Sequence, residues 1–133
     1  FTLPFPIDPM ATKILVVEDY WDSRAILKVL LQNLGYTVIE AENGQEGLEK
    51  AAAELPDLII MDIGLPGMDG IETTLKLKQN PATAGIPVVA YTIWKERSYQ
   101  ERAQQAGIVE YLTKPTPPPV FKDVIERALE VRC

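Results

Sequence analysis

Residues 56–70 read PDLIIMDIGLPGMDG. The apolar run Leu58–Met61 in this stretch contains no alternating polar residue, which is typical of a strand that is buried on both faces, as the strands of a parallel sheet are. Asp62 follows the run directly. Because an unpaired carboxylate beside a buried strand is costly, we expect Asp62 to have a partner or a function.

Similar runs occur elsewhere, with helical patterns between them. Two further apolar runs lie at 14–17 and 88–91, and weaker strands are predicted at 36–40 and 109–112. Apolar stripes at helical spacing come from Leu27, Leu30, Leu31 and Leu34, and from Phe121, Val124, Ile125, Ala128 and Leu129. The alternation predicts an α/β fold, a doubly wound five-stranded parallel sheet with five helices in three αβα layers.

Residues that favour helix ends fall between the predicted elements. Asn43-Gly44 can begin the second helix, Asp69 can cap the third, and Asn80-Pro81 can end it. Gly35 and Gly107 are in place to end the first and fourth helices. These positions support the same five βα units.

Composition excludes several classes of function. The chain has 133 residues, 47% of them hydrophobic, which fits one domain with a real core. It contains no histidine, which excludes His-based triads, His-rich metal sites and an imidazole base. Its 19 acidic and 13 basic residues give a net charge of -6, so we expect no direct nucleic-acid partner and no membrane surface. The single cysteine, Cys133, cannot form an internal disulfide, and we expect a cytoplasmic location.

Polar residues are placed at or just after the ends of four predicted strands. Glu18 and Asp19 follow the first strand, Asp62 the third, Thr92 the fourth and Lys114 the fifth. The carboxyl ends of parallel strands meet at one edge of a sheet, where ligands bind. We therefore expect these side chains to converge.

The three carboxylates of this group need a cation. They would repel one another and raise their own pKa values unless a positive charge neutralised them. Oxygen-only ligands in small number suit Mg²⁺. Lys114 is the fixed positive partner, and we expect its ammonium to pair with Asp62 in the absence of ligand and with phosphoryl oxygens in their presence.

Four motifs, in this order, carry a resemblance to a known family. They are Val17-Glu18-Asp19, residues 56–70, Ala90-Tyr91-Thr92 and Tyr111-Leu112-Thr113-Lys114-Pro115. Together they closely resemble the receiver domain of two-component response regulators, of the single-domain type similar to chemotaxis regulators. The resemblance runs from about Lys13 to the end of the chain and implies the flavodoxin-like strand order 2-1-3-4-5.

The resemblance implies roles for the acidic residues. Asp62 looks like the phosphoacceptor, a nucleophile that takes a phosphoryl group from a phosphohistidine and becomes an aspartyl phosphate. Asp19 and Asp62 would bind Mg²⁺ directly. Glu18 would act through a water, and the backbone carbonyl of Gly64 would supply another oxygen.

It also implies roles for residues on the last two strands. Lys114 would bind the phosphoryl group, and the Thr92 hydroxyl would donate a hydrogen bond to the same group. Tyr111 matches the family's switch aromatic, which moves inward as the threonine follows the phosphate. The Lys114-Pro115 peptide bond is expected to be cis.

The function implied by the resemblance is that of a phosphoacceptor signalling domain. It is not an enzyme beyond Mg²⁺-assisted self-phosphorylation and autodephosphorylation. The expected partners are a histidine kinase or histidine phosphotransfer protein, which supplies the missing histidine, and a downstream effector protein. A phosphate on Asp62 would change effector affinity through the fourth helix and fifth strand.

Three alternatives compete with this function. A pseudo-receiver that only binds partners is possible if Ile93 and nearby aromatics disable the switch, although Asp62, Thr92 and Lys114 argue against it. A Mg²⁺-dependent hydrolase would need an acid-base carboxylate two residues after Asp62, but this position is Gly64. A flavin protein would need a phosphate-binding loop in place of the acidic pair.

Departures from the family pattern lie near the predicted site. Ile93 stands where a small residue is usual, Trp94 follows it, and Tyr20 and Trp21 follow the acidic pair. We expect these residues to flank the mouth of the site, and the aromatic ones, both tryptophans included, to cover the acyl phosphate from water. The stretch 107–110 lacks the usual polar loop and predicts an apolar docking edge.

Domain bounds follow from the same patterns. Residues 1–9 carry three prolines and no periodic pattern and precede Met10, so we expect them to be added residues outside the natural protein. Residues 10–133 are expected to form the receiver domain. No output domain follows this fold in the sequence, which leaves a stand-alone regulator or a receiver from a longer protein.

Overall fold

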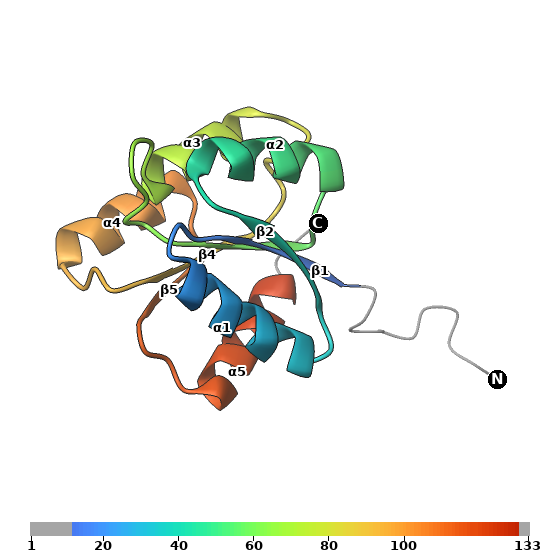
Figure 1. Ribbon diagram of the computed structural model, residues 1–133. Coiled ribbons are helices and arrows are strands. Elements are labelled where there is room, and N and C mark those ends of the chain that lie inside the picture. The colour runs from blue at the N-terminus through green and yellow to red at the C-terminus, as the bar shows by residue number, and fades with distance from the viewer. Residues whose placement is uncertain (1–11, 131–133) are drawn as a thin grey trace.

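The computed structural model describes residues 12–130 of the chain, in which strands and helices alternate (Figure 1). The strands are β1 (Lys13–Val17), β2 (Thr37–Ala41), β3 (Leu58–Met61), β4 (Val88–Thr92) and β5 (Glu110–Thr113). The helices are α1 (Trp21–Asn33), α2 (Gly44–Glu54), α3 (Gly70–Gln79), α4 (Arg97–Ala106) and α5 (Pro118–Glu130). Residues 1–9, Met10 and Cys133 lie outside the described residues, so the domain bounds stay predictions.

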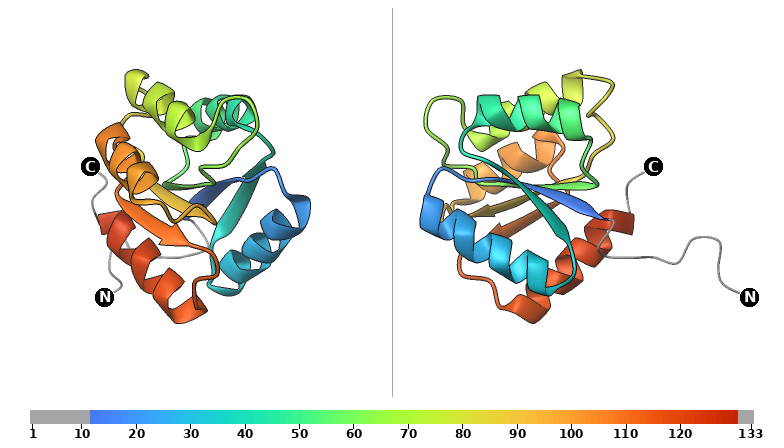
Figure 2. Two further views of the ribbon diagram at one scale, coloured as in Figure 1. Left: turned by 90° about the vertical axis from the view of Figure 1, so that its left-hand side faces the viewer. Right: turned by 45° about the vertical axis from the view of Figure 1, so that its right-hand side comes forward.

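The five strands form one parallel sheet in the order β2-β1-β3-β4-β5. Helices α1 and α5 cover one face, and α2, α3 and α4 cover the other (Figure 2). This architecture confirms the predicted doubly wound α/β fold and its strand order. The βα connections bring the carboxyl ends of all the strands to one edge.

Two hydrophobic clusters hold the layers together. Alternate residues of β1 point to opposite faces, so Ile14 belongs to the cluster on the side of α1 and α5, while Leu15 belongs to the cluster on the side of α2, α3 and α4. The central strand β3 is apolar throughout because both of its faces are buried. The predicted stripes are confirmed, since Leu31 on α1 and Phe121 on α5 are fully buried.

Element boundaries differ from the prediction by one residue in several places. Strand β2 begins at Thr37. The Thr37 N–H donates to the Thr12 carbonyl at 3.0 Å, next to the start of β1. Strand β4 includes Thr92, which was predicted to follow it. The predicted caps are confirmed, because Asn43 and Asp69 each accept a backbone N–H at 2.8 Å.

The helices are short. The longest, α1 and α5, have 13 residues each. Within residues 12–130, none of them combines the length and apolar character that a membrane span requires.

Gly70 lets α3 begin against the loop that carries Asp62. A Cβ at Gly70 would lie 2.2 Å from the Asp62 carbonyl oxygen and 2.8 Å from the Ile63 Cα. The Gly70 N–H also donates to the Ile63 carbonyl at 2.9 Å. Any side chain at position 70 would therefore displace the backbone next to Asp62.

We expect Gly70→Ala to lower the free energy of unfolding by about 2–3 kcal/mol, because the new methyl group overlaps backbone atoms that cannot move aside. Gly85→Ala is the matched control, since no atom lies within 4 Å of a Cβ built there. Its effect should stay below about 1 kcal/mol. Urea denaturation measures both, and equal effects of the two substitutions would contradict this account of Gly70.

Candidate functional site

Three carboxylates meet at the carboxyl edge of the sheet. Strands β1 and β3 are neighbours, and the Asp62 N–H donates to the Val17 carbonyl at 3.0 Å, which places the two strand ends level. One oxygen from each of Glu18, Asp19 and Asp62 lies within 4.8 Å of the others. The predicted convergence of these residues is confirmed.

Lys114 brings a positive charge to the carboxylates. Its Nζ forms an ion pair with Glu18 Oε1 and a second one with Asp62 Oδ2 at 4.0 Å. The predicted ion pair with Asp62 is present, and Glu18, which was not predicted as a partner of Lys114, is the nearer carboxylate. The Glu18 side chain is 5% exposed and that of Asp62 13%, and the more buried carboxylate needs the ammonium more.

Burial governs the ionisation of Glu18. Loss of solvent, helped by a hydrogen bond with Asp62, raises the pKa of Glu18 to about 7, against the lowering effect of Lys114. Both forms of this carboxyl are therefore populated near neutral pH. Glu18, Asp19 and Asp62 together therefore carry less than three full negative charges when Lys114 is the only cation in contact with them.

Thr92 and Tyr111 both hold the chain that follows β4. Thr92 is fully buried, and its Oγ1 accepts the Trp94 N–H at 3.3 Å. The Tyr111 hydroxyl donates to the Trp94 carbonyl at 2.6 Å. Burial, with the charges of Glu96 and Asp62, raises the pKa of Tyr111 to about 12, so this hydroxyl stays a donor.

A cavity of about 380 Å³ opens above the carboxylates. It is lined by Glu18, Asp19, Tyr20, Asp22, Ser23, Asp62, Gly64, Ile93, Trp94 and Lys114. Tyr20, Ile93 and Trp94 thus flank the mouth as predicted. Trp21, the first residue of α1, is not among the residues that line the cavity, so its predicted place at the mouth is wrong and it is not placed to cover the site.

Trp94 packs over the loop after Asp62. A Cβ at Gly64 would lie 3.1 Å from Trp94 Cε2, so the indole occupies space that a side chain at position 64 would fill. The ring of Tyr99 lies on it, with the centroids 4.5 Å apart. The Gly64 N–H donates to Asp62 Oδ1 at 3.1 Å. Gly64 therefore both orients the Asp62 carboxylate and makes room for the indole.

Arg24 supports the acidic loop, although no sequence pattern marks it as part of the site. Its Nη1 donates to the Glu18 carbonyl at 2.7 Å, and its Nε donates to Glu40 Oε1 at 3.3 Å. This residue ties α1 and β2 to the turn that carries Glu18. A basic residue early in a helix is common and does not by itself indicate a site. The main contact of Arg24 is with a backbone carbonyl, which every residue has, so the sequence does not identify it.

The donor set fits a hard divalent cation. The cluster offers carboxylate oxygens from three residues within 4.8 Å of one another, and one of these residues is exposed. Mg²⁺ prefers sites of this kind, with few carboxylates. Soft metals would need sulfur or nitrogen ligands, and this cluster has neither. The Lys114–Pro115 peptide bond beside it is cis, as expected.

Comparisons with known proteins agree with this geometry. Residues 14–126 match the family model of the response regulator receiver domain. The chain is 36% identical over 120 residues to the polar-differentiation response regulator DivK of Brucella anthropi, covering 90% of this chain and 98% of that protein.

Solved structures give the same result. A putative response regulator from Chloroflexus aurantiacus superposes with a TM-score of 0.85 at 30% identity, over 90% of this chain and 98% of that one. The receiver domain of sensor histidine kinase PA1611 from Pseudomonas aeruginosa superposes with a TM-score of 0.83 at 28% identity, over 90% and 98%. That domain has a magnesium ion coordinated in its active site cleft.

In metal-free protein, we expect the free energy of unfolding to fall as pH rises from about 4.5 to about 7. In this window the folded protein holds a proton on Glu18 that the unfolded chain has released. Glu18→Gln should remove this contribution, which is at most about 3 kcal/mol. Denaturation in the presence of a chelator measures it, with exposed Glu101→Gln as control. Parallel pH profiles for wild type and Glu18→Gln would contradict the assignment.

Proposed function

Because the chain belongs to the response regulator receiver domain family, we propose that it accepts a phosphoryl group on Asp62 from a phosphohistidine of a partner histidine kinase or phosphotransfer protein. Receiver domains are signalling domains of two-component systems rather than enzymes that turn over a substrate. The observation that carries the proposal is the meeting of Glu18, Asp19 and Asp62 with Lys114 at one edge of the sheet.

The proposed reaction uses Asp62 as the nucleophile. One of its carboxylate oxygens attacks phosphorus, and the phosphorus–nitrogen bond to the donor histidine breaks. The electron pair of that bond stays on the imidazole, which takes up a proton, and an aspartyl phosphate remains on Asp62. Such a transfer needs positioning and charge neutralisation more than acid-base catalysis, so a chain without histidine can perform it.

Four residues are proposed to hold Mg²⁺: Asp19 and Asp62 directly, Glu18 through a water, and Gly64 through its backbone carbonyl. The bound ion would supply neutralisation of the phosphoryl oxygens. Among the residues of this chain, Lys114 supplies a second positive charge. A phosphoryl group on Asp62 would compete with Glu18 for the Lys114 ammonium, because both offer anionic oxygens within its reach.

Thr92 and Tyr111 are proposed to carry the signal away from Asp62. If the Thr92 hydroxyl turns to donate to the phosphoryl group, its contact with the Trp94 N–H is lost. Trp94 is also the acceptor of the Tyr111 hydroxyl, so movement of this loop reaches Tyr111. One short segment thereby connects the phosphoacceptor to strand β5.

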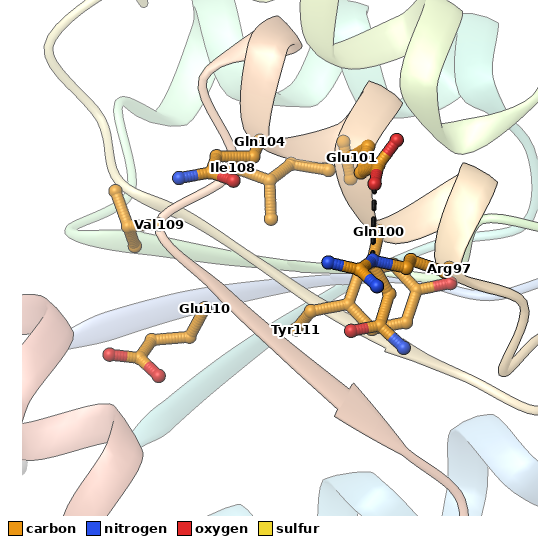
Figure 3. Close-up of a pocket in the computed structure, with 9 residues that line it drawn as sticks. Arg97, Gln100, Glu101, Gln104, Ile108, Val109, Glu110 and Tyr111 are labelled. Carbon is orange, nitrogen blue, oxygen red and sulfur yellow. Dashed lines mark ion pairs between the residues drawn. The ribbon is translucent and has the colours of Figure 1, made fainter.

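The surface beyond Tyr111 is the proposed effector site. A groove of about 690 Å³ lies between α4 and β5 (Figure 3). Tyr111 lies in this groove together with Arg97, which is ion-paired with Glu101 at 3.2 Å. Of the predicted apolar edge, Ile108 is buried and Val109 is 41% exposed, so Val109 gives the groove its exposed apolar contact. An effector that binds here would sense the position of Tyr111.

No observation favours the pseudo-receiver. Ile93 is 67% exposed at the rim of the cavity, which leaves the space above Asp62 open. We also propose a cytoplasmic location, on the argument that one cysteine permits no internal disulfide.

We expect the wild-type protein, incubated with Mg²⁺ and phosphoramidate, to gain the mass of one phosphoryl group, and Asp62→Asn to gain none, because the amide is no nucleophile. Intact-mass spectrometry measures this. Asp22→Asn, which changes an acid at the rim of the same cavity, is the matched control and should still be phosphorylated. An adduct that persists in Asp62→Asn, or a wild type that never forms one, would refute the proposal.

We expect Trp94→Ala to shorten the lifetime of the aspartyl phosphate several-fold, because the indole over Gly64 keeps water from the acyl phosphate. The loss of phosphate with time, followed by mass after removal of the donor, gives the rate. Trp21→Ala removes the other tryptophan, which lies outside the cavity, and should leave the lifetime unchanged. The same lifetime in Trp94→Ala and wild type would rule out the covering role.

A further inference from the structure

Tyr91 is an aromatic residue next to the site that the proposed function leaves unused. It precedes Thr92 in β4, but successive residues of a strand face opposite ways, and Tyr91 belongs to the hydrophobic cluster on the side of α1 and α5. Its ring meets the Phe121 ring edge-to-face, with centroids 4.9 Å apart and an interplanar angle of 83°. This contact fixes the plane of the Tyr91 ring.

The strand order requires Lys114 to pass β4. Lys114 follows β5, whereas its partners Glu18 and Asp62 follow β1 and β3, and β4 lies between β5 and β3. The Lys114 N–H donates to the Thr92 carbonyl at 2.8 Å, which anchors the base of the side chain to β4. The side chain must therefore extend across the end of β4 to reach the carboxylates.

The Tyr91 ring lies along this path. Lys114 Nζ is 5.4 Å from the centroid of the Tyr91 ring and lies over it. A cation at this distance is attracted by the negative face of an aromatic ring, more strongly where water is excluded. The Lys114 side chain is only 18% exposed. The geometry is that of a cation–π contact in a partly dry environment.

We propose that Tyr91 is a positioning residue for Lys114, and that its ring face holds the ammonium at the carboxyl edge of the sheet without taking up the N–H groups that bind the carboxylates. A carboxylate at this place would take up those donors and compete with Asp62 or a phosphoryl group. A ring face attracts the charge without accepting a strong hydrogen bond. The consequence for phosphorylation rests on the proposed function, whereas the contact itself does not.

The surroundings of Lys114 on this side support the assignment. A cavity of about 160 Å³ adjoins it, lined by Ser23, Ile26, Leu27, Leu30, Tyr91 and Lys114. Apart from Lys114 itself and the small Ser23, these lining residues are aliphatic or aromatic. An aliphatic residue at position 91 would offer the ammonium no electrostatic attraction, and the side chain would gain freedom to turn into the cavity.

The test compares Tyr91→Leu, which removes the ring, with Tyr91→Phe, which keeps it. In NMR spectra of the protein without metal or phosphodonor, the ring current should shift the Lys114 ε-methylene protons upfield in wild type and Tyr91→Phe, and this shift should be lost in Tyr91→Leu. Lys114→Arg assigns the resonance by its disappearance. Should Tyr91→Leu fail to fold, Tyr91→Met removes the ring with a different shape.

Phosphorylation by phosphoramidate with Mg²⁺ is the second readout. The rate should fall roughly three- to tenfold in Tyr91→Leu and stay at the wild-type value in Tyr91→Phe. A Lys114 resonance that is unshifted in wild type overturns the contact, and an equal rate in all three proteins overturns the positioning role. If no protein is phosphorylated, the proposed function fails, and the NMR comparison still decides the contact.

Discussion

Three carboxylates held within 4.8 Å of one another are the constraint on which the rest of this structure depends. Like charges at this distance repel, and the fold keeps them together by placing Glu18 and Asp62 on neighbouring strands whose ends are level. Gly70 allows α3 to begin against the Asp62 backbone, and Arg24 holds the Glu18 carbonyl. The βα connections thus create a site that an added cation would stabilise.

Lys114 is the ammonium that the described part of the chain brings into contact with this cluster. It approaches from β5, across β4, and its reach to the carboxylates is supported by the Tyr91 ring. Its nearer partner is Glu18, and Asp62 is the second. This arrangement leaves Asp62 less neutralised by Lys114 than Glu18 is, which fits the nucleophilic role proposed for it. The loop of Trp94 then connects the same site to Tyr111 and the groove beside α4.

Much of this could be predicted from sequence, because its causes are local or topological. Apolar runs such as Leu58–Met61 mark strands buried on both faces, and Asn43 and Asp69 cap the helices that follow them. Once the strands are parallel, their carboxyl ends must meet, so the convergence of Asp62 with Lys114 follows without a structure.

Other features depend on how deeply each side chain is buried and on which way it points, and neither can be read from a single sequence. Whether Lys114 lies nearer to Glu18 or to Asp62 is decided by which carboxylate is more deeply buried. Trp21 adjoins the site in sequence, yet the start of α1 turns it toward solvent. The Tyr91 ring meets Lys114 only because β4 lies between β5 and β3.

The central claim is that Lys114 is shared between Glu18 and whatever occupies Asp62. A crystal structure of the protein with Mg²⁺ and beryllofluoride, a mimic of the phosphoryl group, measures this directly. We expect Lys114 Nζ to leave Glu18 and contact a fluorine on Asp62, and the Thr92 hydroxyl to lose its hydrogen bond from the Trp94 N–H and donate to another fluorine. Beryllofluoride on Asp62 with Lys114 still paired to Glu18 would contradict it.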